Sequence, residues 1–300
     1  MHRSHSLYFF VLSALTVLTC ATEEVIAAGN LDQPRTNIIN GTGVAPDEFP
    51  QFALLKIYQP DHDRNRACSA TMIASNKVLT AGHCIDGFLV NSRFTVIPEH
   101  YDQPIISESD DEIDVIDAVV HPNYDEKVYD IENDIAVLTL ARHTEGPVAS
   151  VLIGDTPLSD KSATGYGIGL VNYDQQELPE ILQKYTTTIV SNKACQQDPN
   201  SGLYLDDRKI CVSPRMSIAV VCFGDSGGPL MVRTPIGRAG AGIASYADSN
   251  CFSGETYVAY TRVTEFTDFI KEHSPRTRFI GLDAHGVSPS VLDLLLSDQR

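Results

Sequence analysis

The sequence predicts an all-β fold, and three observations indicate it. From Ile38 to about residue 272, short runs rich in Val, Ile, Thr and aromatic residues follow one another, which is the composition of strands. Gly, Pro, Asn and Asp separate the runs, as they do at turns, and helical periodicity is weak until Val263. Many short strands at this spacing predict a sandwich or a barrel. Examples of the runs are Phe52–Tyr58, Thr71–Thr80, Phe94–Ile97, Ile135–Leu140, Thr186–Val190, Pro229–Val232 and Ala239–Ser245.

The N-terminus has the pattern of an export signal. Arg3 and its neighbouring histidines precede an apolar run from Leu7 to about Leu18, and the small residue Ala21 follows. The run has the length of a signal-peptide core, whereas a membrane anchor, the alternative, would need a longer one. We therefore expect a signal peptide over residues 1–21, a polar propeptide over residues 22–37 and a secreted, extracellular product.

The C-terminal part of the chain changes in character. Helical periodicity begins over Val263–His273, where Phe266, Phe269 and Ile270 fall on one face. A further short helix is predicted to start at Ser288-Pro289 and to carry a largely apolar surface. We expect the folded domain to span residues 38–273 and residues 274–300 to form a separate extension.

Charge and motifs exclude several functions. The formal net charge of −17 disfavours nucleic acid and acidic membrane surfaces as partners. The sequence has neither a Walker loop nor a dinucleotide fingerprint, so no cofactor is expected. The acidic run Ser107–Asp117 has carboxylates that suit calcium, but it lacks the DxDxDG pattern. A solvated acidic loop is the favoured interpretation, and no metal is expected.

Cysteine usage supports export to an oxidising compartment. The chain has seven cysteines, and cleavage after Ala21 removes Cys20 and leaves six. Spacing alone does not choose between their pairings, and structural disulfides are the expectation. None lies in a CxxC pair, which disfavours a zinc site. The six are Cys68, Cys84, Cys195, Cys211, Cys222 and Cys251.

A glycine-rich stretch carries the strongest chemical signal. Residues 222–229 read CFGDSGGP, so Ser226 lies in a segment whose glycines let the backbone turn sharply. Such a loop can present a hydroxyl beside converging N–H groups, which is the arrangement of a nucleophile with an oxyanion pocket. Taken alone, the stretch is also compatible with an ordinary turn after a strand.

Two further stretches weigh against the ordinary turn. Residues 79–84 read LTAGHC and place His83 at the end of an apolar run, while residues 133–138 read NDIAVL and place Asp134 at the start of one. Each is usually structural when it occurs alone. Together with GDSGGP, in the chain order His, Asp, Ser, they resemble the chymotrypsin-like serine endopeptidases. The resemblance extends from Ile38 to about His273.

The resemblance implies both a fold and a set of roles. The fold would be two antiparallel six-stranded β-barrels, over about 38–155 and 156–262, followed by a C-terminal helix. His83 and Asp134 would come from the first barrel and Ser226 from the second. Ser226 would be the nucleophile, His83 the general base and acid, and Asp134 the residue that orients His83. The backbone N–H groups of Gly224 and Ser226 would form the oxyanion hole.

The resemblance also implies a disulfide pattern and an activation step. In the family, cleavage frees an α-amino group that pairs with the aspartate before the nucleophile, and the matching residues here are Ile38 and Asp225. The chain departs from the family at Asn37, where a basic residue is usual, so we expect either direct cleavage there or cleavage after Arg35 with trimming. Asn40 begins a glycosylation sequon. The implied disulfides are Cys68–Cys84, Cys195–Cys211 and Cys222–Cys251.

Substrate preference is predicted from the register with the family. Val220 would form the floor of the specificity pocket, where a trypsin-like enzyme has an aspartate, so cleavage after Arg or Lys is disfavoured. Ala247 and Val258 would narrow its walls, where wide pockets have glycines. The stretch Ser245-Tyr246-Ala247 would pair with the substrate backbone as an added strand. We expect a preference for small or medium apolar residues.

The sequence thus predicts a secreted serine endopeptidase that is made as a zymogen. Its expected partners are protein or peptide substrates and protein protease inhibitors, and its expected state is a monomer. The alternative is a catalytically silent relative that acts as a binding protein or an inhibitor. The usual sign of that role is a replaced triad residue, and all three are present here.

Overall fold

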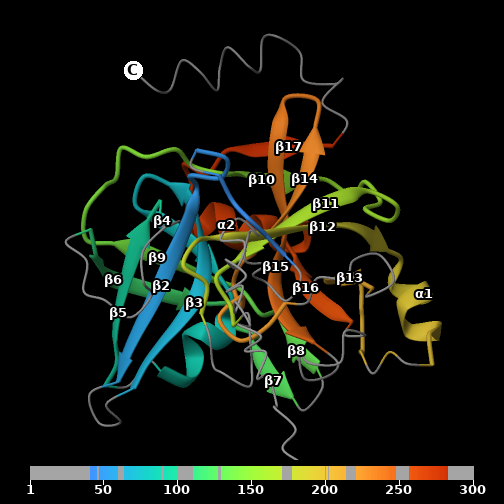
Figure 1. Cartoon of the computed structure of the whole chain (residues 1–300), viewed down its shortest axis with the longest axis horizontal. Helices are drawn as coiled ribbons and strands as arrows, with labels where there is room; N and C mark the ends of the chain where they lie inside the picture. The colour runs from blue at the N-terminus through green and yellow to red at the C-terminus, as the bar shows by residue number, and fades with distance from the viewer. Residues whose placement is uncertain are drawn as a thin grey trace, which may run out of the picture. The chain divides into compact units, whose positions relative to one another are not determined.

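The computed structural model describes residues 41–282, with internal gaps (Figure 1). The gaps are residues 46, 60–63, 89–90, 100–110, 128–129, 171–177, 200, 202, 214–220 and 248–256. The described residues all belong to one compact unit, 34–300, and no helix among them is long and apolar enough to cross a membrane. Several expectations fall outside the described residues. They are the signal peptide, the propeptide, Ile38, the sequon at Asn40, residues 107–110 of the acidic run, Val220, Cys251 and residues 283–300. The acidic run was expected as a solvated loop, but its part from Ile113 to Asp117 lies in the strand β6 (Ile113–Val120).

Six antiparallel strands close the first barrel. Their order around it is β2 (Phe52–Gln59), β3 (Arg64–Ala74), β4 (Lys77–Thr80), β9 (Ala136–Leu140), β6 (Ile113–Val120) and β5 (Arg93–Pro98). The run Thr71–Thr80, expected as one strand, is the end of β3 and the whole of β4. The polar pair Ser75-Asn76 separates them, because these side chains favour turns. A hairpin of β7 (Asp125–Lys127) and β8 (Asp130–Glu132) lies between β6 and β9.

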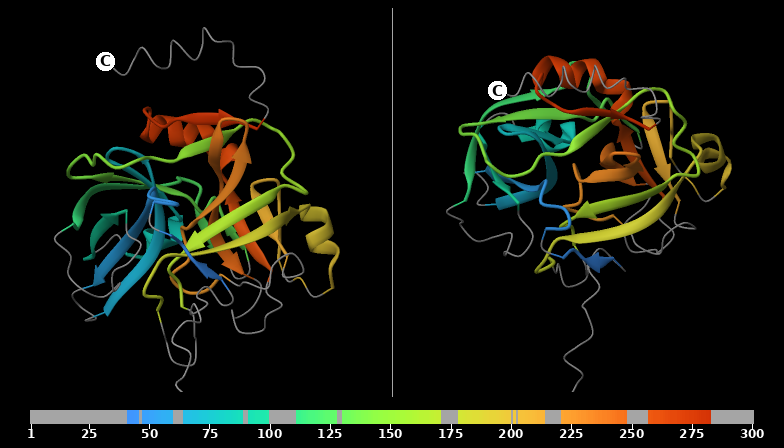
Figure 2. Two further views of the ribbon diagram at one scale, coloured as in Figure 1. Left: turned by 45° about the horizontal axis from the view of Figure 1, so that its top comes forward. Right: turned by 90° about the horizontal axis from the view of Figure 1, so that it is seen from above.

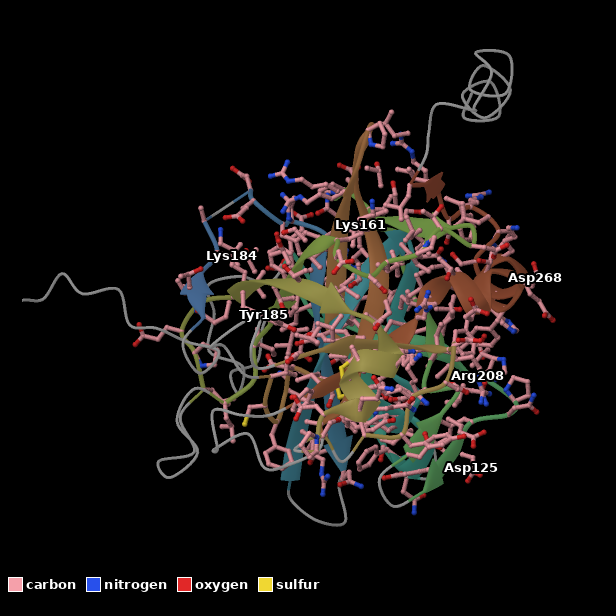
Figure 3. The ribbon with its side chains drawn as sticks, turned by 90° about the vertical axis from the view of Figure 1, so that its right-hand side faces the viewer. Asp125, Lys161, Lys184, Tyr185, Arg208 and Asp268 are labelled. Carbon is pink, nitrogen blue, oxygen red and sulfur yellow. A yellow bond between two sulfur atoms is a disulfide. The ribbon has the colours of Figure 1, made fainter. Side chains whose placement is uncertain are left out.

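Six more antiparallel strands close the second barrel. Their order is β11 (Ser162–Gly167), β12 (Gln183–Val190), β13 (Lys209–Val212), β16 (Val258–Arg262), β15 (Gly237–Ala247) and β14 (Pro229–Thr234), and β14 also pairs with β11. Side chains alternate along β12, where Tyr185 is buried and its neighbour Lys184 is partly exposed (Figure 3). The two six-stranded barrels confirm the fold expected from the resemblance, and Figure 2 shows them beside each other.

Two short helices accompany the second barrel. Helix α1 (Asn192–Gln197) begins after Ser191, whose side chain accepts a hydrogen bond from the backbone N–H of Ala194. The C-terminal helix α2 (Thr267–His273) follows the 3₁₀ turn η5 (Val263–Phe266). Phe269 and Ile270 are buried on it, as the apolar face predicted.

Three short strands cross the expected domain boundaries. β1 (Thr42–Gly43) pairs with β12, and β10 (Ser150–Ile153), which the boundary near residue 155 gave to the first barrel, pairs in parallel with β15. Beyond the boundary at residue 273, β17 (Phe279–Gly281) pairs with β10, and Ile280 is 4% exposed. The structure therefore continues the folded unit to residue 282. β17 covers the free edge of β10, whose backbone groups would otherwise lack partners.

Two of the three disulfides implied by the resemblance lie within the described residues. Cys68 on β3 is joined to Cys84, and Cys195 on α1 is joined to Cys211 on β13, as the resemblance implied. Cys222 is also disulfide-bonded, and its expected partner Cys251 lies outside the described residues. The first bridge fixes the short turn that follows β4.

Candidate active site

His83 lies in a 3₁₀ turn, η2 (Gly82–Cys84), directly after β4. The Cys68–Cys84 disulfide fastens this turn to β3. Gly82 is needed for close approach, because a Cβ there would lie 3.0 Å from the Tyr124 ring and 3.3 Å from Oδ1 of Asp134. The local sequence therefore brings the His83 backbone against Asp134.

Asp134 lies between the β7–β8 hairpin and β9 and has no exposed surface. The preceding residue, Asn133, has a φ of +52°, in the left-handed region that asparagine tolerates. Its amide nitrogen donates to the carbonyl of Asn123 at 2.6 Å, and its amide oxygen accepts from Arg208 at 2.8 Å. These contacts hold the bend that turns Asp134 inward.

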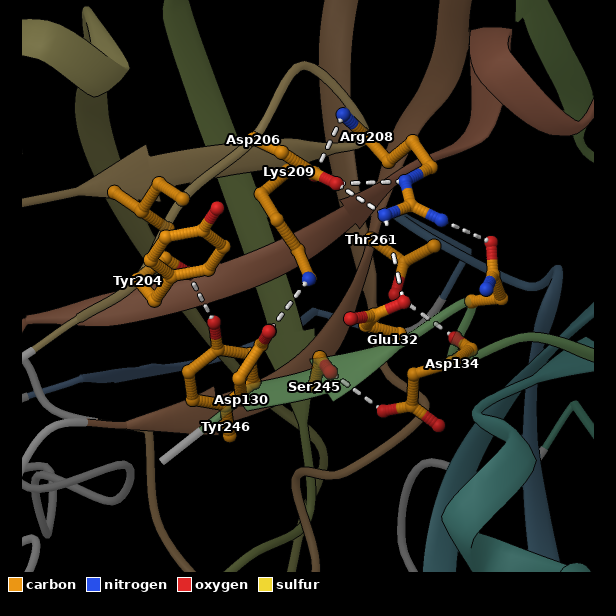
Figure 4. Close-up of polar contacts among 12 residues, drawn as sticks. Asp130, Glu132, Asp134, Tyr204, Asp206, Arg208, Lys209, Ser245, Tyr246 and Thr261 are labelled. Carbon is orange, nitrogen blue, oxygen red and sulfur yellow. Dashed lines mark hydrogen bonds and ion pairs between the residues drawn. The ribbon is translucent and has the colours of Figure 1, made fainter. Parts of the chain in front are cut away.

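His83 and Asp134 are joined by two hydrogen bonds. Nδ1 of His83 lies 2.8 Å from Oδ2 of Asp134, and the backbone N–H of His83 donates to Oδ1 at 2.9 Å. Figure 4 shows two donors from the second barrel on the same residue. Ser245 Oγ donates to Oδ2 at 2.5 Å, and Thr261 Oγ1 donates to the Asp134 carbonyl at 2.8 Å. Asp134 therefore has fixed donors on both carboxylate oxygens.

The two side chains shift each other's pKa. Burial disfavours the imidazolium of His83, but the Asp134 carboxylate outweighs burial and raises the pKa of His83 above 6.5. Burial likewise disfavours the carboxylate of Asp134, but His83 and the hydrogen bond from Ser245 outweigh it and lower its pKa. At neutral pH, Asp134 is therefore ionised and positioned to stabilise a proton that His83 takes up.

Ser226 lies in the loop between β13 and β14, and the backbone of this loop is bonded to β3 of the first barrel and to β15 of the second. The Ser226 carbonyl accepts from the backbone N–H of Ser69 at 2.8 Å, and the next N–H, that of Gly227, donates to Ala244 at 2.9 Å. A Cβ on Gly227 would lie 3.2 Å from the backbone nitrogen of Ala81, two residues before His83. The loop is thus packed between the turn that carries His83 and the strand that carries Ser245.

Gly224 and Gly227 supply backbone angles that this loop needs. Their φ values are +102° and +81°, where other residues are strained. The carbonyl of Phe223 accepts from Leu170 N at 2.8 Å. The C=O and N–H of one trans peptide point in opposite directions, so the N–H of Gly224 is directed away from Leu170. This fixes the direction of one of the two expected oxyanion donors.

Asp225, beside Ser226, is the second buried carboxylate of the site. It is 2% exposed, and it accepts from the backbone N–H of Gly169 at 2.7 Å and of Cys222 at 2.8 Å. Burial raises its pKa to about 7, although the two amide donors favour the carboxylate. Close approach to Asp225 is what requires glycine at residue 169, where a Cβ would lie 2.5 Å from the carboxyl carbon.

The expected pocket residues lie on two paired strands. Ser245, Tyr246 and Ala247 end β15, and Val258 begins β16. Ala247 and Val258 are directly opposite each other in the antiparallel pairing, and Val258 is 4% exposed. Val220, the expected floor, lies outside the described residues.

Several supporting residues were not found by sequence reasoning. Ser245 was expected only to pair with substrate, whereas its hydroxyl also holds Asp134. Thr261 was not singled out at all. Lys209 is 1% exposed, and its ammonium lies 3.2 Å from Asp130 on the β7–β8 hairpin (Figure 4). No spacing signal identifies these residues, because each contact joins elements that are distant in the sequence.

The comparisons with known proteins identify the family of the chain. A family model described as Trypsin matches residues 38–270. The chain is 30% identical to "Lectizyme" of Glossina austeni over 88% of this chain and 96% of that protein. It is 28% identical to "Trypsin-1" of Astacus astacus, over 79% and 100%. It is 27% identical to "Chymotrypsin-like elastase family member 3B" of Homo sapiens, over 80% and 90%. The chain therefore belongs to the trypsin family and is a serine endopeptidase.

Proposed function

We propose that this endopeptidase is secreted as a zymogen and cleaves peptides after small or medium apolar residues through a Ser226–His83–Asp134 triad. The observation that carries the proposal is the doubly hydrogen-bonded pair of His83 and the fully buried Asp134, with the Ser226 loop packed against Ala81, two residues before His83. A residue pair of this kind suits an imidazole that must accept a proton from a serine.

The reaction divides into two displacements. Ser226 Oγ attacks the substrate carbonyl while Nε2 of His83 takes the hydroxyl proton, and the developing oxyanion is held by the N–H groups of Gly224 and Ser226. His83 then gives its proton to the leaving amine as the peptide bond breaks. Water enters, loses a proton to His83 and releases the acyl group from Ser226, which regains its proton. Asp134 stabilises the imidazolium in both halves.

Activation is proposed to act on Asp225. In the described residues its hydrogen bonds come from neutral backbone amides, and burial holds its pKa at about 7. An α-amino group freed at Ile38 by cleavage after Asn37 would supply the missing positive charge. Because such an amine has a pKa near 8, activity should fall in alkaline buffer as the amine loses its proton. N-terminal sequencing of active enzyme checks the cleavage site, and a start other than Ile38 contradicts it.

The proposed preference rests on the wall of the pocket. Ala247 and Val258 face each other across β15 and β16, where two glycines would leave more room. A peptide library should therefore report Ala, Val and Leu before the cleaved bond. The double variant Ala247→Gly, Val258→Gly should shift the profile toward larger side chains, and a profile dominated by Arg and Lys would contradict the assignment. One methylene discriminates by about 1–3 kcal/mol, so the preference should be broad.

A labelling experiment tests the central proposal. The secreted, processed protein should react with a fluorophosphonate probe, and the Ser226→Ala variant should not. The precursor with residues 22–37 attached is the matched control and should react much more slowly. Absence of label on protein that begins at Ile38 would favour the alternative, a silent relative that binds its targets without cleaving them.

A further inference from the structure

Ser69 on β3 is a buried polar residue that the catalytic roles above do not use. It has no exposed surface, and it faces Leu54 in the first barrel. Burying a hydroxyl is unfavourable unless it is hydrogen-bonded. The partner of this hydroxyl is not in its own barrel, because Ser69 Oγ donates to the carbonyl of Gly224 in the second barrel at 2.9 Å.

Ser69 contacts the two residues whose amides are the expected oxyanion donors. Its hydroxyl holds the Gly224 carbonyl, and its backbone N–H holds the Ser226 carbonyl at 2.8 Å. Its own carbonyl accepts from Oγ1 of Thr80 at 3.0 Å. The hydroxyl and the N–H of Ser69 therefore bind the serine loop, and its carbonyl binds β4 of the first barrel.

The serine loop lies directly against Ser69, with no room for side chains between them. A Cβ on Gly227 would lie 2.3 Å from the Ser69 carbonyl oxygen, and one on Gly228 would lie 3.1 Å from the Ser69 Cβ. The glycines thus serve to lay the loop directly on Ser69. Other carbonyls of the loop accept from backbone N–H groups: Cys222 from Asp225, Phe223 from Leu170, and Asp225 from Gly228. The carbonyl of Gly224 accepts from a side chain, so a single substitution can remove its donor.

We propose that Ser69 is a positioning residue for the oxyanion hole, and this inference rests on the proposed triad mechanism. The Gly224 carbonyl belongs to the peptide that lies between the two donor peptides, 223–224 and 225–226, and the Ser226 carbonyl belongs to the peptide that follows them. By holding both carbonyls from outside the loop, Ser69 limits the rotation of the peptides that carry the donor N–H groups. A preorganised donor stabilises charge that develops in the transition state and has little effect on substrate binding. The contribution of Ser69 should therefore appear in kcat.

The test compares Ser69→Ala with a matched control in the processed enzyme. Ser274 is also fully buried, and its hydroxyl accepts from Thr277 after α2, so Ser274→Ala deletes a buried hydroxyl outside the site. For a peptide substrate with alanine before the cleaved bond, Ser69→Ala should lower kcat by about two- to tenfold, the range of one neutral hydrogen bond, with KM unchanged. Ser274→Ala should leave both constants unchanged, even if its thermal midpoint falls equally.

A second measurement separates positioning from general destabilisation. A peptide aldehyde forms a hemiacetal with Ser226 and places an oxygen in the oxyanion hole, whereas the corresponding peptide alcohol does not. The inhibition constant of the aldehyde should rise by the same factor as kcat falls, and that of the alcohol should stay constant. Ser69→Gly, which also removes the hydroxyl, provides the same measurement if Ser69→Ala does not fold.

The outcomes distinguish this inference from the proposed function. If the parent enzyme neither hydrolyses peptides nor reacts with the fluorophosphonate, the proposed function is wrong. If the parent is active but both Ser69 variants keep its kcat and aldehyde affinity, only the role of Ser69 is overturned. Equal losses for aldehyde and alcohol would also overturn it, because they would indicate a structural effect on the whole pocket.

Discussion

Two buried aspartates of the candidate active site, Asp134 and Asp225, have opposite pKa shifts. Both are almost entirely removed from solvent, and burial raises the pKa of each. The pKa of Asp134 is nevertheless lowered, because the positive charge of His83 and the hydrogen bonds from His83 and Ser245 stabilise the carboxylate. Asp225 has two backbone amides, and its pKa rises to about 7. Neutral donors alone do not compensate for burying a carboxylate.

In the proposed mechanism, this difference separates a carboxylate that already has its charged partner, Asp134, from one whose partner would come with processing, Asp225. Asp134 is ionised at neutral pH with the partners that the described residues provide. Asp225 is half protonated at a pH of about 7, so a new cation beside it has a large effect on the loop that carries Ser226. On this view, catalysis depends on the first carboxylate and its regulation on the second.

Replacing Asp134 should have the largest effect on activity. In Asp134→Asn, the amide nitrogen faces Nδ1 of His83 and stabilises the wrong tautomer of the imidazole. We expect kcat to fall by the order of 10⁴-fold, the loss that this change causes in triads of known mechanism. Steady-state kinetics on processed enzyme measure it, with circular dichroism as a check on folding. A loss below tenfold would remove Asp134 from the triad.

Replacing Asp225 should have a smaller effect on activity, and only in the chain that has been cleaved before Ile38. Asp225→Asn removes the partner of the proposed Ile38 amine and leaves that cation buried without a counter-charge. Breaking such a pair costs about 3–5 kcal/mol, so processed enzyme should lose roughly 10²–10³-fold in kcat/KM. The unprocessed chain should show no comparable change in its fluorophosphonate reactivity. An equal loss in both forms would contradict a role in activation.

The same aspartate should make the precursor less stable as the pH rises. The pKa of Asp225 is about 7 in the folded chain and 3.8 as an ordinary value, so the folded state holds its proton more tightly. Its contribution to stability is complete below a pH of about 4 and is lost as the pH rises toward 7. Urea unfolding of Ser226→Ala precursor, with and without Asp225→Asn, isolates this contribution.

The comparison includes its own control. Asp134 and His83 titrate in both precursor proteins, so their contributions cancel when the two free energies of unfolding are subtracted. The difference should change between pH 4 and 7 in favour of the asparagine variant. After processing, the Ile38 amine should lower the pKa of Asp225 and abolish that trend. A difference that does not vary with pH would show that Asp225 has an ordinary pKa in the folded precursor.

Removing one donor from Asp134 should have the smallest effect. Ser245→Ala deletes a hydrogen bond to a charged acceptor, which is worth about 1.5–3 kcal/mol. Two further bonds, both from His83, remain, so we expect a loss near the lower limit, about tenfold in kcat. The pH at which kcat/KM reaches half its maximum should rise as well, because a carboxylate without the Ser245 hydrogen bond stabilises the imidazolium of His83 more strongly and raises the pKa of His83 further. An unchanged pH profile would assign Ser245 to substrate binding alone.

The sequence alone was sufficient to predict features that depend on residues close together in the chain. The strand-like runs, the apolar face of α2 and the three motif stretches follow from residue order, because side-chain alternation and turn preferences act over a few residues. The disulfides Cys68–Cys84 and Cys195–Cys211 and the two barrels were implied by the resemblance, and the structure has them. The run Thr71–Thr80 was wrongly expected as one strand, because the turn at Ser75-Asn76 that divides it is short.

Contacts between distant segments needed the folded chain. Nothing near Ser69, Ser245, Thr261 or Lys209 in the sequence indicates a partner, and each finds one in a segment far along the chain. The attachment of β10 and β17 to the second barrel is of the same kind. Hydrogen bonding and charge compensation depend on distance in space, and closing two barrels sets those distances. For that reason the ionisation of Asp134 and Asp225 is a property of the tertiary structure and not of the motifs that contain them.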